Sequence, residues 1–271
     1  MRTVDLVHWN PRRRSRAGNT DRGLAALRRV NNFGDLLGPR IVTEILRRRC
    51  GGRIPRASQR GQRLLSVGSV LRLSRAGDVV WGTGMNGKSL GQPLSTTDLD
   101  VRAVRGPRTA SFLESVGVNA PHVYGDPGLL VGTLWPRESF AAARAKSEVV
   151  VIPNLNDLPH MDARDPRLVL PTSPLKQVLS RITSADLVVG SSLHAIVIAE
   201  AFGVPARAVR SDEEPEFKYQ DYFEGSGRTG VEISHSVEDA IAMGGAQPLD
   251  WDPAPLLRAF PWDLWAAPAH E

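Results

Sequence analysis

The chain has 271 residues, which is long enough to bury a full hydrophobic core and suits one large domain or two small ones. Charged residues make up 23% of it and apolar residues 41%, proportions that exclude a largely disordered chain. The single cysteine, Cys50, excludes an internal disulfide and a metal site built from several cysteines, and it agrees with a reducing compartment.

The net charge of +5 comes from arginines that gather in two runs, at residues 12–16 and 47–63. Such runs are usually solvated surface, but they also suit a polyanion, an anionic substrate or an anionic membrane face. Few aromatic residues lie between the arginines and no zinc-finger spacing is present, so we expect no nucleic-acid partner. Peripheral contact with a membrane stays open.

The start of the chain, residues 1–10, lacks the basic-then-apolar layout of a signal peptide. No apolar run approaches the length that spans a bilayer. We therefore expect a cytoplasmic protein, with a position at the inner face of the membrane left open.

In the first half of the chain, short apolar runs rich in β-branched residues predict buried strands. Residues 10–29 are polar and arginine-rich and predict a loop. Apolar residues at helical spacing from Leu36 to Leu46 predict a helix that ends at Gly51 and Gly52, and a second helix is expected over 109–116. The expected strands are 3–9, 64–67, 78–81 and 101–104.

The second half repeats this alternation after residues 132–146, where the composition changes and where we expect the domain boundary. The expected strands are 148–152, 167–170, 187–189 and 206–209, and the expected helices are 173–184, 192–202 and a terminal one within 253–265. Alternating strands and helices predict an α/β protein with two Rossmann-like domains, 1–140 and 141–271, that face a cleft as in GT-B enzymes. The terminal helix should dock back on the body.

His194 is the strongest candidate for a functional residue. It lies in the first turn of a predicted buried helix that directly follows a predicted buried strand, behind Ser191 and Ser192 as capping residues. In open α/β sheets ligands bind at the carboxyl ends of strands, and a helix N-terminus there attracts anions. A purely structural histidine under a loop is the alternative. Glu200, in the same apolar helix, should either pair with an arginine or face a ligand.

Other polar residues also lie at predicted strand ends. Asn32 and Asp35 either cap the following helix or belong to a site. Arg105 and Arg108 lie at a strand-to-helix junction, where a guanidinium binds a phosphate or carboxylate through two hydrogen bonds, and structural ion pairing is the alternative. Asp126 lies in a turn that follows the next apolar run.

Several short motifs occur together in one order along the chain. They are Asn-Phe-Gly-Asp at 32–35, Val-Trp-Gly-Thr-Gly at 80–84, Val-Arg-Gly-Pro-Arg-Thr at 104–109, Gly-Asp-Pro-Gly at 125–128, Ser-Ser-Leu-His at 191–194 and Glu-Ala-Phe-Gly-Val-Pro at 200–205. In these motifs and their order the sequence resembles the polysaccharide pyruvyl transferase family. Members of that family transfer the pyruvyl group of phosphoenolpyruvate to a sugar, forming a cyclic ketal across two hydroxyls, and have a GT-B-like fold.

The resemblance implies that His194 and Arg105 belong to the donor site. The N-terminal domain, 1–140, would be the acceptor side and the C-terminal domain, 141–271, the donor side. The imidazole of His194 would supply or accept the proton. Many members have an arginine two residues before this histidine, where this chain has Ser192. We expect Lys218, or else Arg108, to supply the missing cation, aided by the N–H groups that follow Ser191.

The expected partners are phosphoenolpyruvate as donor substrate and a sugar or glycan acceptor, with a lipid-linked acceptor left open. Asp35 or Asp126 would orient the sugar or accept a hydroxyl proton. We expect no cofactor and no metal, because no set of His, Cys, Asp and Glu has ligand spacing. A GT-B nucleotide-sugar glycosyltransferase, which would share an acidic residue such as Glu200, and a catalytically silent binding protein are the alternatives.

Overall fold

Two parallel β-sheets form the framework of the protein in a computed structural model that describes residues 3–12, 29–140 and 147–266. The first sheet has the order β1-β2-β3-β4, and the second has the order β5-β6-β7. Every strand pair in both sheets is parallel. The strands are β1 (Asp5–Val7), β2 (Arg63–Leu65), β3 (Asp78–Trp81), β4 (Leu99–Ala103), β5 (Ser147–Val151), β6 (Ala185–Gly190) and β7 (Ala206–Ala208).

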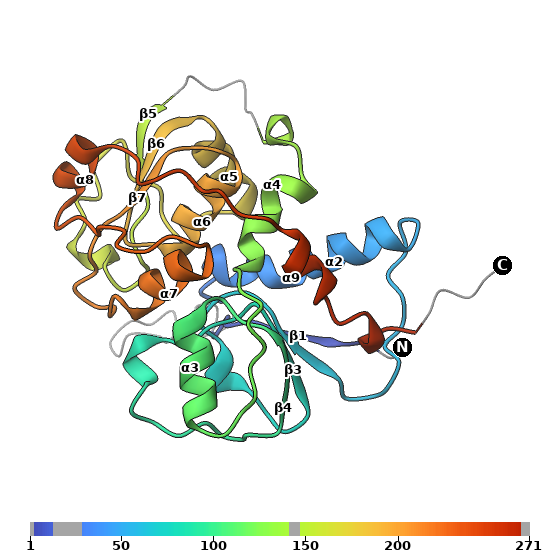
Figure 1. Cartoon of the computed structure of the whole chain (residues 1–271). Helices are drawn as coiled ribbons and strands as arrows, with labels where there is room; N and C mark the ends of the chain where they lie inside the picture. The colour runs from blue at the N-terminus through green and yellow to red at the C-terminus, as the bar shows by residue number, and fades with distance from the viewer. Residues whose placement is uncertain (1–2, 13–28, 141–146, 267–271) are drawn as a thin grey trace, which may run out of the picture.

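Helices connect the strands and pack around both sheets (Figure 1). The helix α6 is apolar almost all round and follows β6, so most of it is buried. The helix α2 instead buries one stripe that includes Ile41, Val42 and Ile45 and exposes the arginines of its last turn. The helices are α2 (Leu37–Arg49), α3 (Pro107–Ser115), α4 (Val131–Leu134), α5 (Leu175–Thr183), α6 (Leu193–Ala201), α7 (Phe217–Gly225), α8 (Val237–Met243) and α9 (Ala254–Arg258).

One hydrophobic cluster extends across the two sheets. Leu64 and Trp81 of the first sheet belong to the same cluster as Val150 and Val188 of the second, with α2 and α6 among the helices that fill it. The mixed α/β fold with parallel sheets, predicted from the sequence, is therefore confirmed. The division into domains 1–140 and 141–271 stays a prediction.

The C-terminal segment returns to the first sheet, as the sequence predicted. The indole N–H of Trp81 donates to the carbonyl oxygen of Leu256 in α9 at 2.9 Å, and the Phe260 ring meets the Trp81 ring edge-on at 5.0 Å. Trp265 then forms an antiparallel bridge with Ala57. In Figure 1 this segment runs beside α2, far from α8 where it starts.

The sequence predicted most elements but not the short helix α4 (Val131–Leu134), and three further differences occur. The expected strand at 167–170 is reduced to a single bridge between Val151 and Leu168. The aromatic stretch at 217–223, to which no element was assigned, is the helix α7, and three of its aromatic residues are buried. The helix α8 (Val237–Met243) was not predicted. Most of the expected loop at 10–29 lies outside the described residues.

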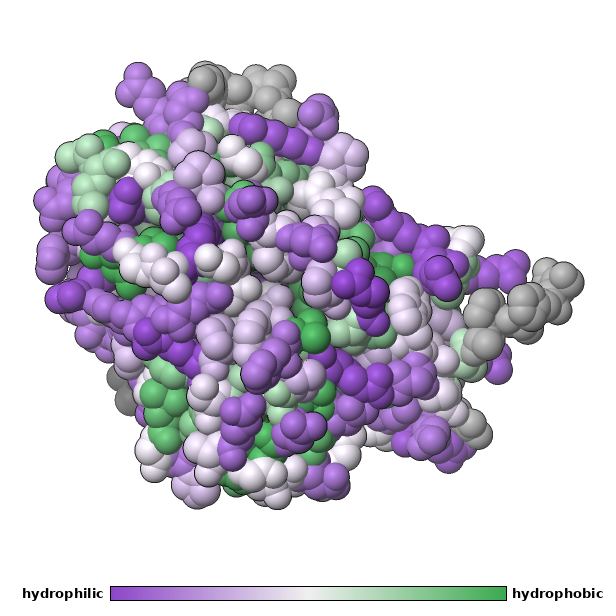
Figure 2. Space-filling model, in the orientation of Figure 1, coloured by the Kyte–Doolittle hydropathy of each residue, from purple (hydrophilic) through white to green (hydrophobic). Residues whose placement is uncertain are grey.

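The surface in Figure 2 is mostly hydrophilic, with hydrophobic residues in small separate patches. No helix among the described residues combines the length and the apolar character needed to cross a bilayer.

Glu200 has a structural role, the first of the two alternatives. Its side chain and that of Arg228 are both buried, and two guanidinium nitrogens donate to its two carboxylate oxygens at 2.7 and 2.8 Å. The hydroxyl of Tyr222 donates to the same carboxylate. These bonds fasten α6 to α7 and to the segment after it.

Replacing Arg228 with leucine should destabilise the protein by about 3–5 kcal/mol, because Glu200 would remain buried without its counter-ion. Arg210→Leu is the matched control, since it breaks the exposed pair with Glu216 and should cost less than about 1 kcal/mol. Urea unfolding of both variants measures the difference. Equal losses would contradict the assigned role of the buried pair.

Candidate active site

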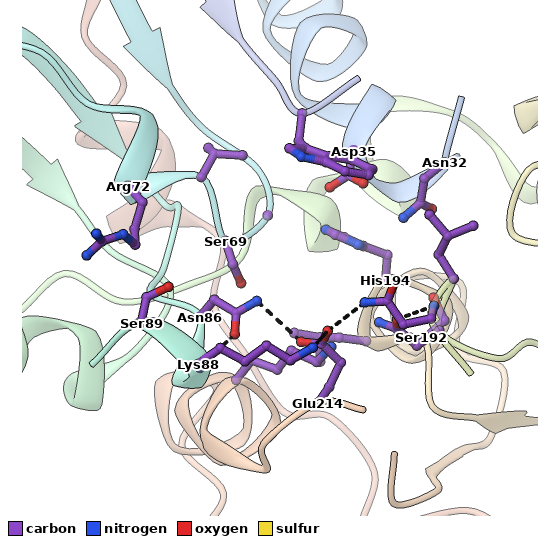
Figure 3. A pocket seen from close by; sticks show the side chains of 18 of the residues that line it. Asn32, Asp35, Ser69, Arg72, Asn86, Lys88, Ser89, Ser192, His194 and Glu214 are labelled. Atoms are coloured by element: carbon purple, nitrogen blue, oxygen red, sulfur yellow. Dashed lines mark hydrogen bonds and ion pairs between the residues drawn. The ribbon is translucent and has the colours of Figure 1, made fainter. Parts of the chain in front are cut away.

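A cavity of about 400 Å³ lies where loops from the carboxyl ends of both sheets meet. Open α/β proteins bind ligands at this end of their strands. Polar side chains from many separate loops point into it, and Figure 3 shows several of them around one space. Its lining includes Asn32 and Asp35 after β1, Ser69 after β2, Lys88 after β3, Arg105 after β4, Asn156 after β5, Ser192 and His194 after β6, and Glu214 and Lys218 after β7.

His194 lies in the first turn of α6, as predicted, and its ring packs on the backbone of Gly34. A Cβ atom at position 34 would lie 2.2 Å from Nδ1, so only glycine fits there. The other ring nitrogen, Nε2, is buried and has no hydrogen-bond partner within the described residues. A buried polar atom of this kind is costly unless a ligand completes it.

The imidazole of His194 is neutral over the physiological pH range. Burial lowers its pKa to about 3, and the positive charges of Lys218 and Arg105 add to this effect. His194 therefore presents an unprotonated ring that can accept a proton or a hydrogen bond.

Asp35 has the opposite shift. Burial raises its pKa to about 7, although Lys218 and a hydrogen bond with the Asn32 side chain act in the other direction. Its Oδ1 atom and the His194 Nε2 atom lie 3.5 and 3.8 Å from the point where a Cβ on Gly68 would sit. The cavity thus holds a carboxyl group whose pKa is raised to about 7, near a neutral imidazole.

Glu214 joins lysines from the two halves of the chain. Lys88 lies 2.9 Å from Oε1 of Glu214, and the buried Lys218 lies 3.5 Å from Oε2. The amide groups of Asn86 and Asn156 donate to the same carboxylate at 3.3 and 2.9 Å. Burial alone would raise the pKa of Glu214, but Lys218, Lys88 and Asn156 lower it below its usual value. This carboxylate therefore stays ionised and balances the two cations.

Arg105 borders the cavity but uses its nitrogens inside the protein. Its Nε donates to Asp221 at 2.9 Å, Nη1 donates to the hydroxyl of Ser69 at 3.0 Å, and Nη2 donates to the carbonyl oxygen of Met85 at 2.8 Å. The side chains of Arg105 and Asp221 are both fully buried. The guanidinium contributes positive charge to the cavity and holds Ser69 in place.

Three of the predicted site residues lie outside this cavity. Arg108 pairs with Glu224 of α7 at 2.7 Å. Asp126 is buried and accepts a hydrogen bond from the N–H of Gly128 at 2.8 Å, which caps a short turn. The hydroxyl of Ser191 accepts from the N–H of Asn154 and donates to Asp157, on the wall of a separate cavity of about 180 Å³.

The family model of polysaccharide pyruvyl transferase matches residues 50–213, more than half of the chain. The chain belongs to the polysaccharide pyruvyl transferase family. It is similar to the succinoglycan biosynthesis protein ExoV of Rhizobium meliloti (strain 1021), with 29% identity over 179 residues. The match covers 61% of this chain and 54% of ExoV, so the chain spans about half the length of this curated relative.

Among solved structures, this pyruvyl transferase family member is similar to a functionally uncharacterised protein from Klebsiella pneumoniae subsp. pneumoniae NTUH-K2044. The TM-score is 0.42 and the identity is 10%, over 72% of this chain and 84% of that one.

In this member of the pyruvyl transferase family, the cavity brings together six of the nine residues that the sequence predicted for the site: Asn32, Asp35, Arg105, Ser192, His194 and Lys218. Sequence analysis missed Glu214, Lys88 and Ser69. Glu214 is a charged residue in a polar loop, and only its spacing of four residues from Lys218 hinted at a pair. In the described part of the chain, no three His, Cys, Asp or Glu side chains lie close enough to hold a metal ion.

Exchanging Arg105 for lysine should destabilise the protein by about 2–3 kcal/mol. Lysine keeps a positive charge but cannot reach Asp221, Ser69 and Met85 together, so buried polar groups lose their partners. Arg108→Lys, at the half-exposed pair with Glu224, is the control and should change the stability by less than about 1 kcal/mol. Thermal and urea unfolding of the two variants test this, and a stable Arg105→Lys protein would contradict it.

Proposed function

We propose that this protein transfers the pyruvyl group of phosphoenolpyruvate to a sugar of an exopolysaccharide or cell-surface glycan precursor and forms a cyclic pyruvate ketal. The observation that carries the proposal is the combination of Asp35, whose pKa is raised to about 7, with the unpartnered Nε2 of His194 in one cationic cavity. Family membership and the similarity to ExoV, a succinoglycan biosynthesis protein, also support this proposal.

The donor carries a carboxylate and a phosphate, and the cavity offers matching cations. Lys218 and Lys88 are drawn together by the single carboxylate of Glu214, in a position that an anionic ligand would share. The N–H groups at the start of α6, next to Ser192, offer further donors to an anion. Lys218 thus takes the role of the arginine that many family members have at the position of Ser192.

The reaction needs one proton donor and one proton acceptor. Asp35 gives its proton to the methylene carbon of phosphoenolpyruvate, which becomes a methyl group and leaves an oxocarbenium-like centre at the adjacent carbon. A sugar hydroxyl attacks that carbon while the neutral ring of His194 takes the hydroxyl proton. The bond to the phosphate oxygen then breaks, the second hydroxyl attacks the same carbon to close the ring, and its proton leaves with the phosphate.

The remaining expectations belong to the same proposal. The two sheets would be the cores of two GT-B-like halves, with the donor held by the C-terminal half and the acceptor entering from the side of Asn32. The reaction needs no metal or organic cofactor, and it takes place in the cytoplasm. The glycosyltransferase alternative loses its main sequence feature, because Glu200 is fastened to Arg228 and does not line the cavity.

Phosphoenolpyruvate should raise the melting temperature of the protein, because a ligand that binds only the folded state stabilises it. When a suitable sugar from a panel of acceptors is present, phosphoenolpyruvate should be consumed and inorganic phosphate released. EDTA should leave the rate of phosphate release unchanged. Differential scanning fluorimetry and a phosphate assay measure both effects. Stabilisation by nucleotide sugars with none by phosphoenolpyruvate would reject the proposed donor.

Replacing Asp35 with asparagine should lower turnover by about 10²–10⁴-fold, the usual contribution of a positioned general acid. In the wild type, kcat/KM should fall tenfold per pH unit above about pH 7, as Asp35 loses the proton that it must donate. The variant should lack that limb of the pH profile. His194→Gln should lower turnover by a similar factor and keep the limb at pH 7, because the pKa of His194 lies far below it.

The stability of the same variants separates chemistry from folding. Asp35 is more stable protonated in the folded state than in the unfolded chain, since burial raises its pKa from the ordinary 3.8 to about 7. The stabilisation that protonated Asp35 provides is complete below the unfolded-state pKa and is lost as the pH rises through about 7. Asp35→Asn should therefore be more stable than the wild type at pH 8, while Asp98→Asn, at an exposed carboxylate, should not. Full activity in a stable Asp35→Asn protein would remove Asp35 from the mechanism.

A further inference from the structure

The C-terminal end of α2 and the loop after it carry positive charge that the proposed reaction does not use. Arg47, Arg48, Arg49, Arg53 and Arg56 are all exposed there, and Arg48 pairs with Glu44 of the same helix at 3.1 Å. Between residues 45 and 77 the sequence contains no aspartate or glutamate. Asp263 lines the cavity beside Arg49 and pairs with Arg102 at 3.0 Å, so this surface keeps a local excess of positive charge.

Two large apolar side chains are exposed among these arginines. Ile54 is 54% exposed and Trp262 is 37% exposed. The guanidinium of Arg49 lies 5.6 Å from the centre of the Trp262 ring, and both residues line an open cavity of about 390 Å³ that reaches Pro55. We name Arg47, Arg49, Arg53, Ile54, Arg56 and Trp262 the arginine face. Apolar side chains between cations are typical of surfaces that enter the headgroup region of a membrane.

The backbone beneath the arginine face is held by the C-terminal segment. The N–H of Ala266 donates to the carbonyl oxygen of Arg56 at 2.9 Å, and the N–H of Ser58 donates to that of Leu264 at the same distance. The ring of Trp262 packs against Phe260 with centroids 4.5 Å apart. Ile54 and Trp262 are therefore presented on supported segments.

The arginine face lies well away from the candidate active site. The helix α2 has 13 residues and is about 20 Å long, with Asp35 just before its first turn and the arginine face at its last. Figure 1 shows this end of α2 beside the C-terminal segment and away from α6 and α7. A surface bound here would leave the cavity accessible.

We propose that the arginine face binds the surface of a membrane that contains anionic phospholipids. The arginines attract the negative headgroups, and Ile54 and Trp262 enter the interface, where an aliphatic side chain and an indole are both favourable. The exposed apolar residues favour a membrane over a soluble polyanion, which would gain nothing from Ile54. This inference does not rest on the proposed pyruvyl transfer.

Sedimentation with lipid vesicles tests the proposal. The full chain should bind vesicles of phosphatidylcholine mixed with phosphatidylglycerol, bind pure phosphatidylcholine vesicles far more weakly, and be released by high salt. The double variant Arg49→Gln/Arg56→Gln should lower the partition coefficient by about 30-fold, from the usual contribution of two cations near an anionic surface. Arg164→Gln/Lys176→Gln removes two exposed charges elsewhere and should bind as the wild type does.

Ile54→Ser separates a membrane from a polyanion, and exposure of Ile54 makes it a variant that folds. It should weaken vesicle binding severalfold and leave binding to dextran sulfate unchanged. Absence of binding to anionic vesicles, or equal losses in the two double variants, would overturn the proposal. Vesicle binding unaffected by Ile54→Ser would also overturn it, because the surface would then act as a general polyanion site.

Discussion

The buried ion pair between Arg105 and Asp221 is the interaction on which the arrangement of the cavity depends. It joins the end of β4 to α7, residues that are 116 positions apart. Asp221 also accepts from the N–H and the hydroxyl of Thr109, so the desolvated carboxylate is well satisfied. The backbone at Gly106 also packs directly on the backbone of α7, since a Cβ on Gly106 would lie 1.8 Å from the carbonyl oxygen of Asp221. This pair fixes α7, and with it the position of Lys218 one turn earlier.

The protonation states in the cavity follow from that arrangement. Arg105 and Lys218 bring positive charge close to His194, and together with burial they keep the ring neutral. The same burial favours the protonated form of Asp35. Tyr219, next to Lys218, donates to the carbonyl oxygen of Ser191 at 2.6 Å and ties α7 to the start of α6. The charge states of these side chains therefore depend on contacts between the two halves of the chain.

The sequence predicted what local pattern controls. The apolar run before Gly190, the two serines and the apolar helix after them placed His194 correctly, because a buried strand and a buried helix each have a local signature. Lys218 was found only by asking what replaces an arginine missing at Ser192. Its position depends on the Arg105 pair, which no local pattern contains.

Other features depended on tertiary contacts and escaped prediction for that reason. Arg105 and Arg108 have similar neighbours in the sequence, yet the first is fully buried and the second pairs with Glu224 at a half-exposed position. The segment at 167–170 has strand character but pairs only through Leu168. Glu214 is important because Lys88 and Lys218 converge on it, and such convergence is a property of the fold.

The contact between His194 and Gly34 has an evolutionary consequence. The ring occupies the volume in which any side chain at position 34 would begin, so the two positions behave as one unit although 160 residues separate them. Even an alanine at position 34 would be tolerated only if His194 were first replaced by a smaller residue or α6 moved away. Substitution of Gly34 is therefore blocked for as long as His194 is retained. A larger residue at position 34 should be found only in homologues that lack the histidine.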